Sequence, residues 1–187
     1  TGLPKHRLAR AFGRHALPLP GAFGITAWNG GGTMWDQLII GGGIAGLTAG
    51  AHLAPLGRVL LLEGEAALGH HSSGRSAALY EAEYGAPATV AVARASLGEL
   101  QALEVLGPRG LLLIGMEGED SDFEADLARM GLAEITLAEA FARVPILNPA
   151  VVTRAGLTER AQDLDTDRLM QAYARRIRAY GGEIRTG

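Results

Sequence analysis

The segment that most constrains the fold is the run Gly41-Gly42-Gly43-Ile44-Ala45-Gly46, because of what lies on either side of it. Residues 36–40 form a short apolar run that is typical of a buried parallel strand. Residues 44–55 have apolar positions at helical spacing, and the following glycine favours helix termination. Residues 58–62 indicate a second buried strand. The pattern predicts a βαβ unit of about 27 residues and an α/β fold that begins with a Rossmann-like nucleotide-binding domain.

Each glycine of this run has its own role in holding a dinucleotide pyrophosphate. Gly41 permits a tight turn, Gly43 lets the phosphates approach the backbone, and Gly46 lets the helix pack closely on the strand. The phosphates then meet free N–H groups and the positive end of the helix dipole. Glu63 follows Gly41 by 22 residues, and its carboxylate can accept hydrogen bonds from adenosine ribose hydroxyls while repelling the 2′-phosphate of NADP. FAD and NAD share this fingerprint, and a glycine-rich turn that binds nothing is the third interpretation.

A second loop follows Glu63, with the sequence GHHSSGRSAALY at residues 69–80. It offers many backbone N–H groups and little side-chain bulk, which suits a chain lying along a planar ring and the end of a pyrophosphate. A simple NAD domain would be expected to enter a helix soon after Glu63. The loop therefore favours FAD, with an ordinary flexible loop as the alternative.

These motifs together resemble the FAD-dependent D-amino acid oxidase superfamily, and within it the D-amino acid dehydrogenase branch of D-arginine dehydrogenase-like oxidoreductases. The resemblance extends from about Met34 to the last residue, and the second loop is its most specific part. The matching pieces are residues 41–46, 59–63, 71–78, 84–85 and 163–167.

The resemblance implies FAD as the cofactor and a small substrate, a D-amino acid or related amine. Oxidation would proceed by hydride transfer to the flavin and give an imino acid that hydrolyses to the 2-oxo acid. Tyr84 is similar to a tyrosine that lines the substrate pocket, and no catalytic side chain is identified. The residues implied to contact the cofactor are Gly41, Gly43, Ile44, Ala45, Gly46, Glu63, Gly64, Ser72, Ser73, Gly74, Arg75, Ser76, Ala77, Ala78 and Leu79.

Two departures from the family pattern argue against D-arginine as the substrate. Leu79 replaces a histidine of the flavin loop, and Leu111 stands where a carboxylate would hold the guanidinium. A buried guanidinium without a carboxylate partner would be costly. An apolar D-amino acid, another amine or a 2-hydroxy acid is easier to accommodate, and oxygen, a quinone and an electron-transfer protein are all compatible electron acceptors.

Composition excludes several other classes of function. The net charge of −3 gives no electrostatic case for nucleic acid. The chain contains no cysteine, which removes thiolate catalysis and zinc thiolate sites. No run reaches the roughly 18 apolar residues of a spanning helix, and we expect a cytoplasmic protein.

Metal binding is not expected either. His70 and His71 are adjacent and have no third ligand nearby in sequence, so packing within the loop or exposure is the better interpretation. Asp163, Asp165 and Asp167 alternate like calcium ligands but lack the glycine and distal glutamate of an EF-hand, so helix capping explains them better.

Four segments are predicted: a basic extension at 1–33, expected to be disordered, an FAD-binding segment at 34–105, the start of an α+β substrate domain at 106–160, and a helix and strand returning to the FAD domain at 161–187. We interpret the chain as a fragment without the C-terminal half. The alternatives are a non-catalytic nucleotide-binding fragment and an NAD-dependent enzyme. Further helices are expected at 87–106, 121–130, 137–142 and 165–180, and strands at 110–115, 151–157 and 183–187.

Overall fold

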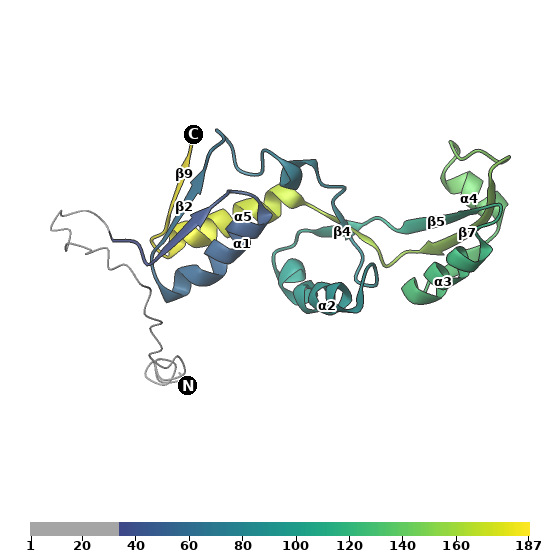
Figure 1. Cartoon of the computed structure of the whole chain (residues 1–187), viewed down its shortest axis with the longest axis horizontal. Coiled ribbons are helices and arrows are strands. Elements are labelled where there is room, and N and C mark those ends of the chain that lie inside the picture. The colour runs from purple at the N-terminus through teal and green to yellow at the C-terminus, as the bar shows by residue number, and fades with distance from the viewer. Residues whose placement is uncertain (1–33) are drawn as a thin grey trace, which may run out of the picture. The chain divides into compact units, whose positions relative to one another are not determined.

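The first sheet is parallel and contains both strands of the predicted βαβ unit, in a computed structural model that describes residues 34–187. Strands β1 (Gln37–Ile40), β2 (Val59–Glu63) and β9 (Glu183–Thr186) lie side by side in the order β1-β2-β9 (Figure 1). Ile40 pairs with Leu62, and Glu63 pairs with Thr186. A strand from the far end of the sequence thus extends the sheet that the glycine run begins.

Two helices pack against each other and against this sheet. They are α1 (Ile44–Leu53), continued by the 3-10 turn η2 (Ala54–Leu56), and α5 (Thr166–Ala179). Their apolar sides meet Val59 and Leu61 of β2 in the main core, where Leu47 and Ile177 are fully buried. A carboxylate oxygen of Asp165 accepts a hydrogen bond from the backbone N of Arg168 at 2.8 Å, which confirms the predicted cap of α5.

Two antiparallel sheets complete the described residues. The second sheet has the order β3-β8-β4, and the third has the order β5-β7-β6. The third sheet is covered by α3 and α4, whose buried residues include Phe123, Met130 and Ala140. The bounds are β3 (Leu79–Tyr80), α2 (Pro87–Ala102), β4 (Leu106–Pro108), β5 (Leu111–Met116), α3 (Asp120–Met130), β6 (Ala133–Ile135), α4 (Leu137–Arg143), β7 (Val152–Thr158) and β8 (Gln162–Leu164).

The structure corrects the sequence-based expectations in two places. The helix expected at 87–106 ends at Ala102, because Glu104 has a left-handed φ of +54° and Leu106 joins a strand. The short strands β3, β4, β6 and β8 were not predicted, because two or three residues carry too little alternation to be recognised. The predicted extension at 1–33 lies outside the described residues.

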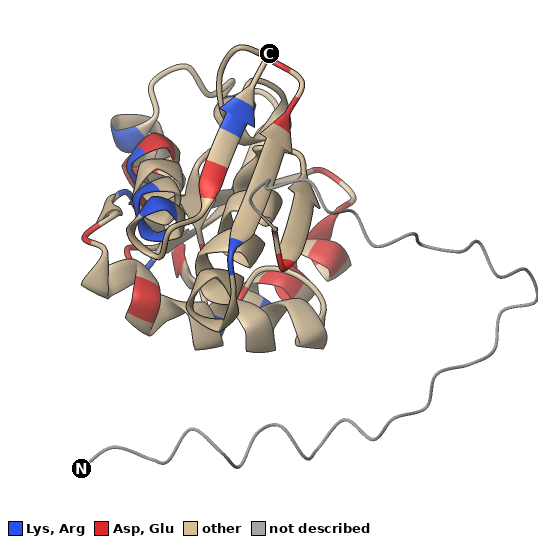
Figure 2. Cartoon of the chain, turned by 90° about the vertical axis from the view of Figure 1, so that its left-hand side faces the viewer, with Lys and Arg blue, Asp and Glu red and all other residues tan. Residues whose placement is uncertain are grey.

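Charge and hydropathy are unremarkable over the described part of the chain. Acidic and basic residues are interspersed along the ribbon (Figure 2). Each helix within residues 34–187 is too short or too polar to span a bilayer.

Candidate functional site

The glycine loop (residues 41–46) forms the turn between β1 and α1 that the sequence predicts. Gly41 has a φ of +105°, which L side chains rarely adopt, and its N–H donates to the carbonyl of Leu62 at 2.7 Å. A Cβ on Gly46 would overlap the carbonyl oxygen of Gly41 and lie 3.3 Å from a side-chain methyl of Ile39. The first turn of α1 can therefore pack under the loop only with glycine at position 46.

The N-terminus of α1 lies beside the hydroxyl group of Ser73. Within residues 34–187, the N-cap residue Gly43 makes no side-chain capping hydrogen bond, and the first turn of α1 contains no acidic residue. The N–H of Ile44 donates to the Ser73 hydroxyl oxygen at 3.0 Å. The positive end of the helix dipole is thus available to an anion.

Glu63 lies at the end of β2 beside this loop. Its two carboxylate oxygens accept hydrogen bonds from the backbone N–H groups of Glu65 at 2.9 Å and Gly42 at 2.6 Å. These bonds favour the ionised form and hold the pKa of Glu63 below its usual range. A carboxylate offers about four acceptor positions, so Glu63 can still accept from ribose hydroxyls.

The glycine loop and Glu63 open into a cavity of about 260 Å³, here called the glycine-loop cavity. Residues from the second predicted loop form its other wall. The lining residues are Gly41, Gly43, Glu63, Gly69, His70, His71, Ser72 and Ser73. Two segments that are separate in sequence therefore meet at one site.

The serine loop (residues 72–79) begins with a 3-10 turn, η3 (Ser72–Arg75), and ends in β3. Ala78 has a φ of +56°, a strained value for a residue with a side chain. The Ala78 N–H donates to the Ser76 hydroxyl at 3.1 Å, and its carbonyl accepts from the Leu164 N–H at 2.7 Å. Backbone strain at a residue that is held in place by hydrogen bonds on both sides is typical of functional loops.

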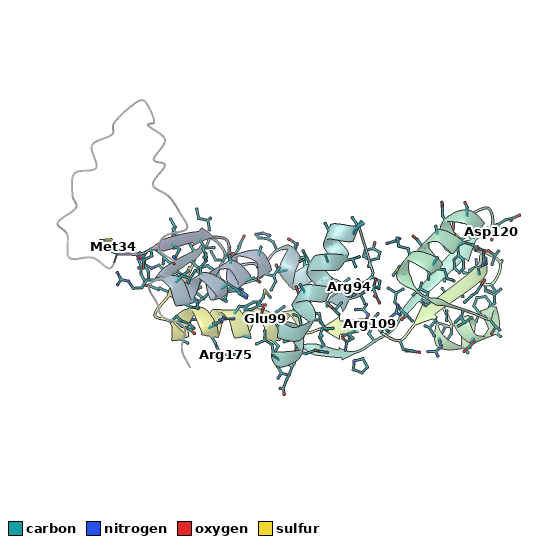
Figure 3. The ribbon with its side chains drawn as sticks, turned by 90° about the horizontal axis from the view of Figure 1, so that it is seen from below. Met34, Arg94, Glu99, Arg109, Asp120 and Arg175 are labelled. Atoms are coloured by element: carbon teal, nitrogen blue, oxygen red, sulfur yellow. The ribbon has the colours of Figure 1, made fainter. Side chains whose placement is uncertain are left out.

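Arg109, labelled in Figure 3, ties this loop to two strands. It follows β4, and its Nη1 donates to the Ala77 carbonyl at 2.7 Å and to a carboxylate oxygen of Asp163 in β8 at 2.9 Å. Arg109 was not predicted as a site residue, because its contacts span 32 residues to Ala77 and 54 to Asp163. No local pattern marks such a contact.

A second cavity of about 260 Å³, here called the serine-loop cavity, shares Ser72 and Ser73 with the first. Its wall is mostly apolar, with hydroxyl groups on one side. The lining residues are Ile44, Ser72, Ser73, Ser76, Leu164, Thr166, Leu169 and Met170. The sequence did not single out the last four as site residues, because α5 and β8 reach the site only through the fold.

The other predicted site residues lie outside these two cavities. Ala45 and Gly46 form the first turn of α1, Gly64 follows Glu63, and Arg75 is exposed at the end of η3. Tyr84 is 62% exposed in a turn and lines neither cavity. Leu111 begins β5 opposite Thr158, and the nearby carboxylate of Glu159 is already paired with Arg143 at 2.9 Å.

An anionic dinucleotide fits the arrangement of these residues. Position 46 admits no side chain, the first turn of α1 contains no acidic residue, and a carboxylate sits at the end of the neighbouring strand. The adjoining apolar cavity suits the face of a planar ring. The features that suit an anion and those that suit a planar ring therefore lie next to each other.

Comparison with known proteins agrees with this arrangement. Solved structures similar in fold include L-proline dehydrogenase from P. horikoshii (TM-score 0.65, 22% identity, covering 79% of this chain and 42% of that one). A second is glycine oxidase from Geobacillus kaustophilus (TM-score 0.65, 22% identity, covering 81% of this chain and 46% of that one). A third is L-alpha-glycerophosphate oxidase from Mycoplasma pneumoniae with FAD bound (TM-score 0.68, 19% identity, covering 81% of this chain and 44% of that one). The chain thus spans less than half the length of these proteins.

The decisive comparison is with sequence families. The family described as DAO, FAD dependent oxidoreductase, matches residues 36–187. That match covers the glycine loop, the serine loop and the strand that returns to the first sheet, and it decides for FAD where the glycine fingerprint left NAD open. The chain belongs to this family of FAD-dependent oxidoreductases, whose cofactor is FAD.

Proposed function

We propose that this chain forms the FAD-binding part of an oxidoreductase that oxidises a D-amino acid or a related amine to the imino acid and then the 2-oxo acid. The observation that carries the proposal is the meeting of the glycine loop, Glu63 and the serine loop around two cavities that share Ser72 and Ser73. One cavity offers backbone N–H groups and a carboxylate, and the other offers an apolar wall with hydroxyls. These are the two environments that the two ends of FAD require.

The proposed division of labour follows the chemistry of each segment. The glycine loop, with Ile44 and Ala45 in the first turn of α1, holds the pyrophosphate through N–H groups and the helix dipole. Glu63 and Gly64 hold the adenosine, and residues 72–79 hold the flavin. The bound flavin supplies the hydride acceptor for the substrate α-carbon. The chain's own contribution is to bind and orient the cofactor and to exclude water from the apolar cavity.

Residues 106–160 are proposed to begin the substrate domain, with residues 34–105 and 161–187 in the FAD domain. Leu111 and the engagement of Glu159 by Arg143 support an apolar substrate over D-arginine, since a guanidinium would find no free carboxylate from either residue. Tyr84 is retained as a candidate pocket residue. The solved structures named above act on different substrates, so the D-configuration rests on the resemblance of the serine loop.

The first experiment purifies the full chain without added cofactor and records its visible spectrum. We expect flavin bands and the release of FAD on denaturation. A colourless protein that takes up no FAD would contradict the cofactor half of the proposal.

The second experiment tests the substrate half with the flavin already bound. Under anaerobic conditions, D-leucine is expected to bleach the flavin, with L-leucine and D-arginine as matched comparisons. Bleaching by L-leucine alone would overturn the D-configuration, and faster bleaching by D-arginine would overturn the apolar preference.

A second candidate function is a nucleotide-binding module that performs no oxidation by itself. It is favoured by one observation, that the chain spans only 42–46% of the length of the three solved structures. The same two experiments separate it from the first candidate, because a module of this kind retains FAD but stays yellow with every amino acid.

A further inference from the structure

The segment between Glu65 and His71 is held by hydrogen bonds at Glu65 and at Gly69. The Glu65 N–H donates to the Glu63 carboxylate at 2.9 Å, and the Glu65 carbonyl accepts from the N–H of Gly187 at 3.0 Å. Gly69 has a φ of +68°, and its N–H donates to the Gly42 carbonyl at 3.0 Å. The backbone that carries Glu65, His70 and His71 is therefore held in one arrangement.

This arrangement brings three metal-binding side chains together. One ligand atom from each of Glu65, His70 and His71 lies within 4.8 Å of the other two. The His71 Nε2 is 2.9 Å from a Glu65 carboxylate oxygen, and the two imidazole rings are nearly perpendicular, at 86° with centroids 5.0 Å apart. Perpendicular rings can direct one nitrogen each toward a common point, so the adjacency of the histidines does not prevent joint coordination.

The sequence-based expectation of no metal rested on the absence of a nearby third ligand. Glu65 lies close enough to the two histidines to be such a ligand, and it precedes His70 by only five residues. Spacing alone did not reveal it, because the turn at Gly69 folds the segment back on itself.

We propose that Glu65, His70 and His71 form a binding site for Zn²⁺, with a fourth position open to water. Two imidazoles and one carboxylate are a zinc ligand set, whereas Mg²⁺ and Ca²⁺ prefer oxygen ligands only. Bonds of about 2.1 Å in tetrahedral geometry place the ligand atoms about 3.4 Å apart. The side chains of His71 and Glu65 are 67% and 41% exposed. They are therefore free to make the small rotations that bring the ligand atoms to this spacing.

The simpler interpretation is a hydrogen-bonded His–Glu pair without a metal. The structure offers an internal comparison in His52 and Glu99, which form such a pair at 3.2 Å with side chains that are 47% and 35% exposed. Within residues 34–187 that pair has no third His, Asp or Glu close enough to complete a site. Glu99 is also paired with Arg176 at 3.4 Å, so the second pair differs from the first both in lacking a third ligand and in having a competing cation.

The zinc proposal does not require the proposed function, although two of its ligands line the cavity that is proposed to hold one end of FAD. These ligands are His70 and His71, so the assay is run on the chain as purified and its occupancy by FAD is recorded. Failure to bind zinc leaves FAD binding untouched, and failure to bind FAD leaves the zinc titration interpretable.

The test is a calorimetric titration of the full, untagged chain with ZnCl₂. His6 and His15, which lie outside the described residues, are replaced by alanine in every sample to remove their imidazoles. We expect one zinc per chain, at least a tenfold loss of affinity in Glu65→Gln, His70→Ala and His71→Ala, and an unchanged affinity in His52→Ala.

Each other outcome counts against the proposal. Absence of zinc uptake, an affinity equal to that of the parent in any of the three ligand variants, or loss of zinc binding in His52→Ala would overturn it. Circular dichroism of each variant checks the fold, and His71→Gln replaces His71→Ala if the latter unfolds, because glutamine can keep the hydrogen bond to Glu65.

Discussion

The glycine loop and the serine loop form two walls of one site but are built in opposite ways. The path of the glycine loop is fixed by Gly41 and Gly46 and by hydrogen bonds to Leu62 and Glu63 at the end of the next strand. The serine loop is held by partners far away in the sequence, namely Arg109 and Leu164. The first loop is therefore determined by local sequence, and the second depends on the rest of the fold.

The largest effect should come from filling the glycine loop. Gly46→Val places a side chain on the Gly41 carbonyl, which must move and take the phosphate-binding N–H groups with it. Overpacking of this kind costs about 3 kcal/mol, so we expect FAD affinity to fall about a hundredfold in a fluorescence titration. The control is Gly98→Ala in α2, where a Cβ meets open space. Equal FAD affinities of the two variants would contradict the conclusion that Gly46 fixes the path of the glycine loop.

A smaller effect should come from releasing the serine loop. Arg109→Ala removes the donor that holds the Ala77 carbonyl and Asp163. Because the arginine side chain is 39% exposed, solvent weakens these bonds, and a loss of about 1.4 kcal/mol corresponds to a tenfold weaker FAD affinity. Arg143→Ala, which breaks the exposed pair with Glu159 on the third sheet, is the control and should leave FAD affinity within about twofold of the parent.

The contact between the loops should contribute less again. Ser73→Ala removes the hydroxyl that accepts from the N–H of Ile44, and loss of a helix-capping oxygen costs about 1 kcal/mol in thermal or urea unfolding. Ser96→Ala is the matched control, since its hydroxyl donates only to the Val92 carbonyl of its own helix. A smaller loss of stability in Ser73→Ala than in Ser96→Ala would show that the two loops do not support each other.

The smallest effect concerns pH. The Glu63 carboxylate is favoured by two backbone N–H donors, so its pKa is lower in the folded chain than in the unfolded one. The stability that it contributes is present at pH values above its usual range and is lost as the pH falls through the folded value. Glu63→Gln should therefore be less stable than the parent at pH 7, and the difference should shrink toward pH 3 in urea titrations. A difference that grows as the pH falls would contradict the account.

The same contrast explains how much the sequence could predict. The two strands and the helix around the glycine loop were predicted to within one to three residues, because their apolar runs and glycines act locally. The helix at residues 166–179 and its cap by Asp165 were also predicted from local signals.

Features that depend on long-range contacts could not be predicted from the sequence pattern. The pairing of β3 with β8, the role of Arg109 and the approach of Glu65 to the two histidines all depend on tertiary contacts or on a single turn. The same limit applies to the apolar wall from Leu169 and Met170, whose spacing marks only a buried helix face.

We propose that both loops bind one molecule of FAD. The most direct measurement is a titration of the nucleotide-free chain with FAD, followed by flavin fluorescence, with ADP, FMN and NADH as competitors. We expect one FAD per chain, competition by ADP through the glycine loop and Glu63, weaker competition by FMN, and little by NADH. Tight binding of NADH with no uptake of FAD would contradict the claim.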